Sequence, residues 1–117
     1  MPRKDEWYED ELILSLDWYF RVGPKRIDGD MDAIEELSGQ LTALNALPGE
    51  SRCVRNTSTV RIRMANSKHH DSNWDGKGYD GGGAKCAAVF KRFASDRSSL
   101  AREARRIVGR IYGAQRD

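Results

Sequence analysis

The sequence predicts one mainly α domain of about five helices, with a Gly-rich loop or short wing in its second half. Its length of 117 residues fits a single domain (residues 1–117) around one hydrophobic core. Apolar residues recur at helical spacing in several segments that end in caps or helix breakers. Five of the eleven glycines gather in residues 71–84, a composition typical of a loop that needs unusual backbone angles.

Two helices are predicted in the first half of the chain. In residues 6–22, apolar side chains fall at i, i+4, i+7 and i+8 on one face, and Gly23-Pro24 then stops the helix. Asp30 is suited to cap a second helix over residues 31–44. The apolar residues of that helix recur at spacings of three, four and three: Ile34, Leu37, Leu41 and Leu44.

Residues 59–65 are compatible with a helix or a strand. The run V-R-I-R-M alternates apolar and basic residues, which is a strand pattern. Ser58 as a cap, with Val60 and Met64 one turn apart, favours a helix instead, and we favour that interpretation. In either geometry Arg61 projects away from the core.

Two more helices are predicted after the Gly-rich loop, over residues 85–94 and 98–112. Asp96 or Ser95 is a plausible cap for the last helix. The positions expected to face inward are Cys86, Val89, Phe90 and Phe93 in the first of these helices and Leu100, Ala104, Ile107, Val108 and Ile111 in the second. Four arginines would line the outer side of the last helix: Arg102, Arg105, Arg106 and Arg110.

The charges are strongly asymmetric along the chain. Residues 1–50 hold five cations and twelve acids, a net charge of −7, whereas residues 51–117 hold fifteen cations and six acids, a net charge of +9. This pattern suggests a surface that faces a polyanion, backed by an acidic one. The alternative is that the two halves pair with each other in the fold.

Several functional classes are disfavoured. Two cysteines and an adjacent histidine pair fit neither a disulfide scaffold nor a tetrahedral metal site, so we expect no cofactor and no metal. Gly76, Gly78 and Gly81 match G-x-G-x-x-G, but no strand precedes them as a dinucleotide site requires. No nucleophile and base stand out, so we expect this chain not to be an enzyme. Without an apolar leader or a bilayer-length apolar run, we expect a cytoplasmic protein with no membrane contact.

The remaining constellation is a basic segment, residues 55–70, followed by the Gly-rich loop. Cations and amides suit phosphates, and Arg, Asn and aromatic groups can reach or stack on bases. A solvated basic face beside a linker is the alternative interpretation. The candidate DNA-binding residues are Arg55, Asn56, Ser58, Arg61, Arg63, Asn66, Lys68, His69, His70, Trp74, Lys77, Tyr79 and Lys85, with Arg55 and Lys85 expected to hold phosphates.

Five stretches also carry a family resemblance: W-Y-E-D-E-L-I-L-S-L-D-W-Y-F, E-E-L-S-G-Q-L, R-N-T-S-T-V-R-I-R-M-A-N, G-K-G-Y-D-G-G-G-A-K and V-F-K-R-F-A-S-D. In this order, over residues 7–108, they resemble the N-terminal domain of bacterial HNH endonucleases of the modification-dependent restriction type. Thr57, Ser67 and the pair His69-His70 depart from the family pattern.

The resemblance implies a DNA-recognition domain of helix-turn-helix or winged-helix type. Its partner would be double-stranded DNA, including DNA with a modified base such as 5-methylcytosine, and cutting would belong to an HNH nuclease domain of a parent protein. A function from another class is a protein-interaction module that uses the acidic N-terminal half of the chain.

Overall fold

The computed structural model describes the backbone of residues 7–23, 30–47, 55–70 and 83–115, and the side chains of residues 7–23, 30–47, 55–64 and 87–113. This part of the chain forms five α-helices and contains no strand. They are α1 (Glu9–Val22), α2 (Met31–Asn45), α3 (Thr57–His70), α4 (Gly83–Phe93) and α5 (Arg97–Gln115). The prediction of a mainly α fold with about five helices is confirmed, and residues 59–65 are helical. The predicted wing falls largely on residues 71–82, which lie outside the described residues.

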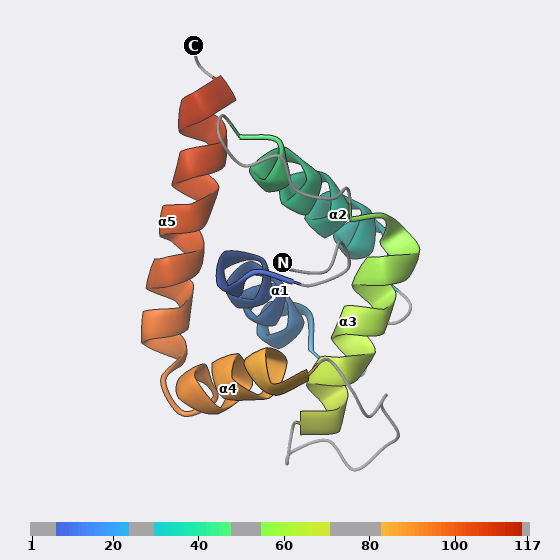
Figure 1. The fold of residues 1–117 in the computed structure, drawn as a ribbon, viewed down its shortest axis with the longest axis vertical. Coiled ribbons are helices and arrows are strands. Elements are labelled where there is room, and N and C mark those ends of the chain that lie inside the picture. Colours follow the sequence, from blue (N-terminus) through green and yellow to red (C-terminus); the bar gives the residue numbers. More distant parts are fainter. Residues whose placement is uncertain (1–6, 24–29, 48–54, 71–82, 116–117) are drawn as a thin grey trace.

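Helix α1 lies at the centre of the fold, and the other four helices surround it (Figure 1). Its turn-and-a-half from Glu11 to Leu16 is buried on every side, which is the pattern of a core helix and not of an amphipathic surface helix. The single inward face predicted for this helix therefore understates its burial. Its end follows the prediction, because Gly23 adopts φ 92° and its N–H donates to the carbonyl of Tyr19 at 2.8 Å.

Helices α2 and α3 cover one side of α1. Asp30 caps α2 as predicted, since its carboxylate accepts the N–H of Ala33 at 3.1 Å. The cap of α3 differs from the expected Ser58: the side-chain oxygen of Asn56 accepts the N–H of Thr59 at 2.9 Å. Asn and Ser are similar in capping strength, so composition alone does not choose between them.

Helices α4 and α5 close the other side. Asp96 begins α5, accepting the N–H of Ser99 at 3.2 Å and its hydroxyl at 2.8 Å. These two hydrogen bonds lower the pKa of the Asp96 carboxyl below its ordinary value. The predicted inward residues of both helices are buried, except that Val108 is only partly buried and the side chain of Cys86 lies outside the described residues.

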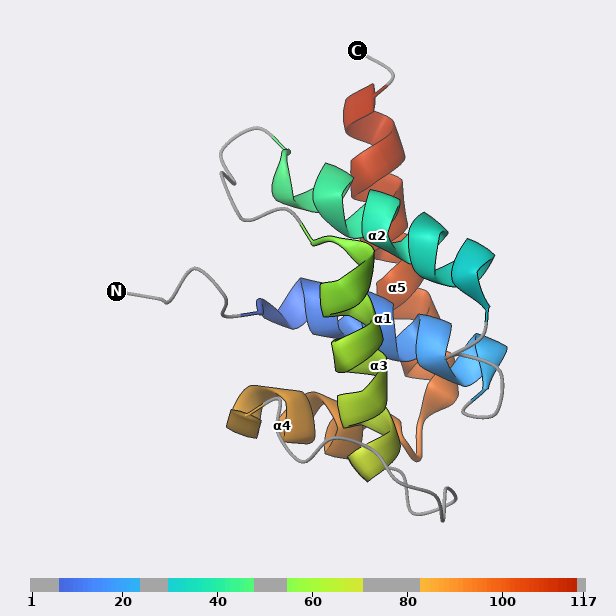
Figure 2. The same ribbon diagram turned by 90° about the vertical axis from the view of Figure 1, so that its right-hand side faces the viewer.

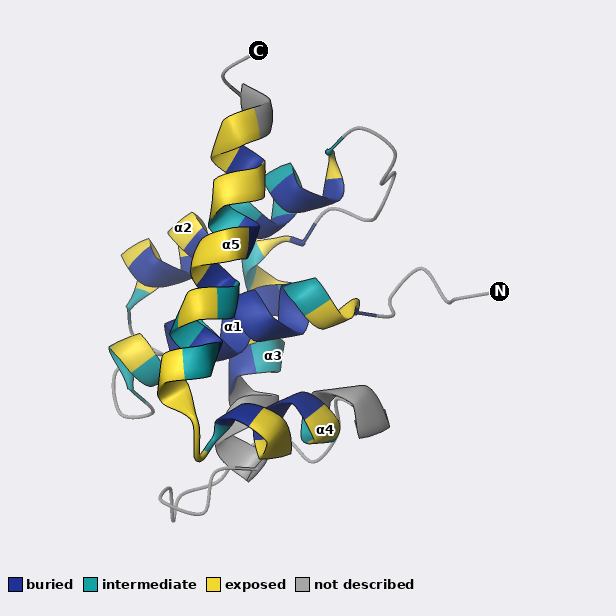
Figure 3. Cartoon of the chain, turned by 90° about the vertical axis from the view of Figure 1, so that its left-hand side faces the viewer, coloured by how far each residue is buried: buried dark blue, intermediate teal, exposed yellow. Residues whose placement is uncertain are grey.

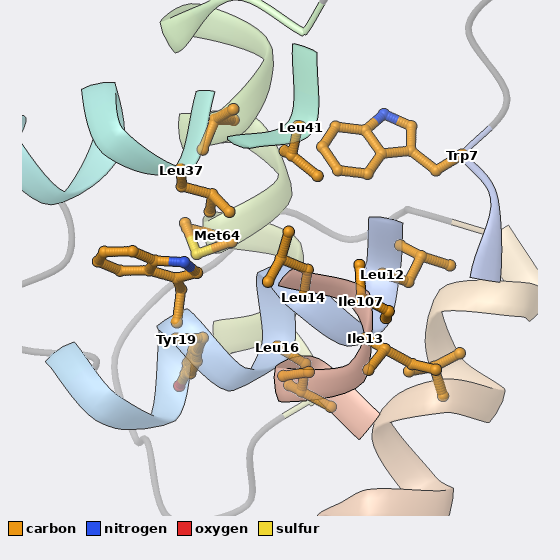
Figure 4. Packing of buried hydrophobic residues seen from close by; sticks show 14 of the residues in the cluster. Trp7, Leu12, Ile13, Leu14, Leu16, Tyr19, Leu37, Leu41, Met64 and Ile107 are labelled. Carbon is orange, nitrogen blue, oxygen red and sulfur yellow. The ribbon is translucent and has the colours of Figure 1, made fainter. Parts of the chain in front are cut away.

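One hydrophobic core joins the helices. Side chains from α1, α2, α3 and α5 meet around Leu14, including Leu37, Met64 and Ile107 (Figure 4). Phe20 of α1 extends the core towards α4, with its ring 5.8 Å from that of Phe90. None of the described helices is both long and apolar enough to cross a membrane.

Candidate nucleic-acid interface

The outward face of α3 carries exposed side chains from the predicted binding segment. Val60 and Met64 lie one turn apart and are fully buried, which fixes the rotation of the helix. Arg61, Ile62 and Ser58 consequently face solvent, and Ile62 is 50% exposed. Helix α3 lies along one side of the molecule, in front of α1 when viewed from that side (Figure 2). Its sequence contains three cationic residues, two histidines and no acid over its whole length.

Arg63 is held on this face by an aromatic ring. Its guanidinium carbon lies 4.5 Å from the centroid of the Trp7 ring, and its side chain is half-buried. Such a contact restricts the rotamers of a long side chain and orients its charged end. Arg63 therefore has a defined position on one flank of α3, and the exposed Arg61 lies on the other flank, because residues two apart are separated by about 160° around a helix.

Arg55 occupies a different environment from the one predicted. It is 3% exposed, and its Nε and Nη2 donate to the two carboxylate oxygens of Glu11 at 2.6 and 3.0 Å. Its guanidinium also lies 4.6 Å from the Trp7 ring centroid. The expectation that Arg55 holds a phosphate is corrected, because its charged group is buried against a carboxylate and does not reach the surface.

Glu11 joins this network to the helices on either side. Besides Arg55, its carboxylate accepts Nδ2 of Asn45 at 2.8 Å and the backbone N–H of Tyr8 at 3.0 Å. The hydroxyl of Ser38 donates to the backbone carbonyl of Arg55. A glutamate at the third position of a helix commonly binds back to the helix start, which is the one local signal that could have singled out Glu11.

The other predicted residues divide into two groups. Asn56 is exposed, and its side-chain oxygen serves as the cap of α3. The remaining candidates are outside the described side chains: Asn66, Lys68, His69 and His70 lie on the second half of α3, Lys85 lies in the first turn of α4, and Trp74, Lys77 and Tyr79 lie outside the described residues altogether. Ile62 was not among the predicted residues, although the helical register set by Val60 and Met64 would place it outward.

The acidic start of α1 pairs with the basic second half of the chain. Its three consecutive acids reach three different segments: Glu9 binds Arg92 of α4 at 3.0 Å, Asp10 lies 3.6 Å from Arg110 of α5, and Glu11 binds Arg55 before α3. Some acids of the first half therefore pair with cations of the second half within the fold, as the alternative interpretation proposed. The pair of Glu9 is open to water and that of Asp10 is partly exposed and longer, so both contribute little to stability, whereas the pair of Glu11 is buried.

Among the described side chains, the cations of the second half also do not share one surface. Helices α3 and α5 do not touch, and α1 lies between them (Figure 1). Arg102, Arg105, Arg106 and Arg110 are exposed on α5, on the side of the molecule opposite α3 (Figure 3). The described arginines of α3 and α5 therefore lie on separate faces and not on the single basic face that was expected.

In the part of the chain with described side chains, no three His, Cys, Asp or Glu residues gather as metal ligands. Cys53, His69, His70 and Cys86 are not among those side chains. No known protein family, curated protein or solved structure matches this chain.

Proposed function

We propose that this domain binds double-stranded DNA through the outward face of α3. The observation that carries the proposal is the composition of that face: Arg61 is exposed, and Arg63 lies half-buried against Trp7 at the edge of the face, on a helix that contains no acid. Guanidinium groups bind phosphates and guanine edges in a bidentate manner. A helix of 14 residues, about 21 Å long, has the dimensions of elements that enter the major groove.

Ile62 supports a preference for a methylated base. It is the exposed large apolar residue of α3, and it stands between the two arginines. The methyl group of thymine or 5-methylcytosine projects into the major groove, where an apolar side chain can cover it. Burying one methyl group is worth about 0.8 kcal/mol, which corresponds to roughly a fourfold difference in affinity. The proposed ligand class is therefore DNA that carries a methylated cytosine, recognised on behalf of a nuclease domain.

Arg61→Ala tests the proposed interface. Titration of a labelled duplex at several salt concentrations should show weaker binding, with a log–log salt slope shallower by about 1 because one phosphate contact is lost. Arg21→Ala is the matched control, since it removes an exposed arginine at the end of α1. Equal affinity and slope for the Arg61 variant and the parent protein would contradict the proposal.

Ile62→Ala separates base reading from phosphate binding. The variant should keep the salt slope and lose the roughly fourfold preference for the methylated duplex. A preference that survives unchanged would remove Ile62 from the recognition surface, while leaving the phosphate contacts of α3 in place.

A second function is favoured by the outer face of α2. Asp32, Glu35 and Glu36 are exposed there, on a helix that carries no basic residue. This acidic face fits a basic protein partner. Retention of the domain on an immobilised basic peptide, lost in Glu35→Gln with Glu36→Gln, would support this function, and equal retention of the variant would exclude it.

A further inference from the structure

Helix α5 presents a second cationic face. Leu100, Ala104, Ile107 and Ile111 are buried, so the opposite side of the helix is turned to solvent. The exposed side carries Arg102, Arg105, Arg106 and Arg110, and Figure 3 shows it running along the outside of the molecule. The eight-residue interval from Arg102 to Arg110 corresponds to about 12 Å of helix. That length matches the width of a major groove, about 12 Å, so the row can reach the phosphates on both of its strands.

Two glycines lie on the same exposed face. A methyl group built at Gly109 or Gly113 would meet nothing within 4 Å, so packing inside this chain does not require a glycine at either position. A glycine within an exposed helix costs about 1 kcal/mol relative to alanine. The absence of side chains at these positions instead lets an external surface approach the helix backbone between the arginines.

Carboxylates near this face reduce its positive charge but do not neutralise it. Glu103 binds Arg106 at 2.8 Å, and Asp10 lies 3.6 Å from Arg110. Both pairs are partly exposed to water, and such pairs are worth about 1 kcal/mol or less, so a phosphodiester group can compete for the arginines. Asp17 lies near Arg105 and Asp96 lies near Arg102, but neither of these two pairs forms a close ion pair in the described structure.

We propose that α5 is a second duplex-binding surface, so that one chain bridges two DNA segments held on opposite sides of the molecule. This inference rests on the proposed function of α3 for its first duplex. A nucleic-acid partner is favoured over an acidic peptide because a row of arginines with no lysine suits bidentate phosphate contacts. The two glycines also leave room for the sugar-phosphate backbone of a duplex to approach the helix. Helices α3 and α5 face away from each other, so two duplexes would not collide (Figures 1 and 2).

The test measures stoichiometry and bridging with the whole chain. Calorimetric titration with a short duplex should give two duplexes per chain for the parent protein. Arg102→Ala with Arg105→Ala should leave one, Arg61→Glu should leave one, and the combination should leave none. In parallel, a duplex fixed to beads should capture a second, labelled duplex only through the parent protein.

Gly109→Gln is the decisive variant, because it adds neutral bulk where the fold has room. It should fold at least as stably as the parent protein, bind one duplex and fail to bridge. Bridging that persists in Gly109→Gln and in the double arginine variant would overturn the proposal, as would a parent protein that binds one duplex and never bridges.

Two further outcomes are separated by the same experiment. Bridging accompanied by a dimer in sedimentation at the same concentration would mean that α5 binds a second copy of the chain, which contradicts the proposal. A parent protein that binds through α5 alone, with Arg61→Glu unchanged, would overturn the proposed function of α3 and leave α5 as the DNA surface.

Discussion

Replacing Arg55 with methionine should strongly destabilise the domain. The guanidinium is the counter-charge of Glu11, whose carboxylate is fully buried. Without it, the carboxylate keeps the hydrogen-bond donors of Asn45 and Tyr8 but loses the guanidinium that balances its charge. Removing one partner of a buried ion pair costs about 3–5 kcal/mol. Because domains of this size are stable by about 5–15 kcal/mol, this is a large fraction of the total.

The double variant Arg55→Met with Glu11→Gln supplies the diagnostic comparison. Asn45 and Tyr8 bind different oxygens of the Glu11 carboxylate, so the one amide oxygen of glutamine replaces only one of these acceptors. The glutamine is neutral, however, and leaves no buried charge without a counter-charge. We therefore expect the double variant to be more stable than Arg55→Met alone, with a coupling free energy above about 1 kcal/mol.

Urea unfolding followed by far-ultraviolet circular dichroism measures these differences, provided that the m-values agree. Arg61→Met is the matched control, because the same change at an exposed arginine should alter stability by no more than about 0.5 kcal/mol. A loss below about 1 kcal/mol for Arg55→Met, or a double variant no more stable than the single one, would refute the assignment of Arg55 to a buried structural pair.

Three other variants test individual features. Asn56→Ala should cost about 1 kcal/mol in urea unfolding through loss of the α3 cap on Thr59, and an unchanged midpoint would deny that role. Burial raises the pKa of the Asp17 carboxyl above its ordinary value, and Arg21 offsets part of this rise. Because the folded state then favours the protonated carboxyl, Asp17 contributes most to the free energy of unfolding below its unfolded pKa of about 3.9, and this contribution is lost as pH rises. Asp17→Asn should therefore be less stable relative to the parent protein at pH 3 than at pH 7, and a difference independent of pH would contradict the burial effect. Gly109→Ala should stabilise the fold by about 1 kcal/mol, whereas a lower midpoint would show an unseen constraint at that position.

Features set by neighbouring residues were predictable from the sequence. The caps Asp30 and Asp96 act within three residues of themselves, and the spacing of apolar residues in α2 and α5 specifies their buried faces directly. The choice of helix over strand for residues 59–65 followed from the same reasoning, with Val60 and Met64 as the inward pair.

Features set by partners distant in sequence were not predictable. Arg55 and Glu11 are 44 positions apart, and nothing local distinguishes an arginine that will be buried from the exposed Arg61 nearby. The separation of the basic residues into two faces depends on where α5 packs around α1, which periodicity within each helix does not determine. Ile62 is the intermediate case, because its exposure follows from the helical register once Val60 and Met64 are taken as inward.

The central position of α1 has a consequence for how the chain reaches its native state. As a ribosome releases the polypeptide, α1 emerges first, yet the helix that covers one of its sides is the last of the five to be made. Domains whose contacts join distant parts of the chain fold more slowly than those built from local contacts, and exposed apolar segments aggregate in the meantime. The nascent protein should therefore bind holdase chaperones through α1 until synthesis has passed Ile111. A chain that ends before α5 should stay bound to these chaperones.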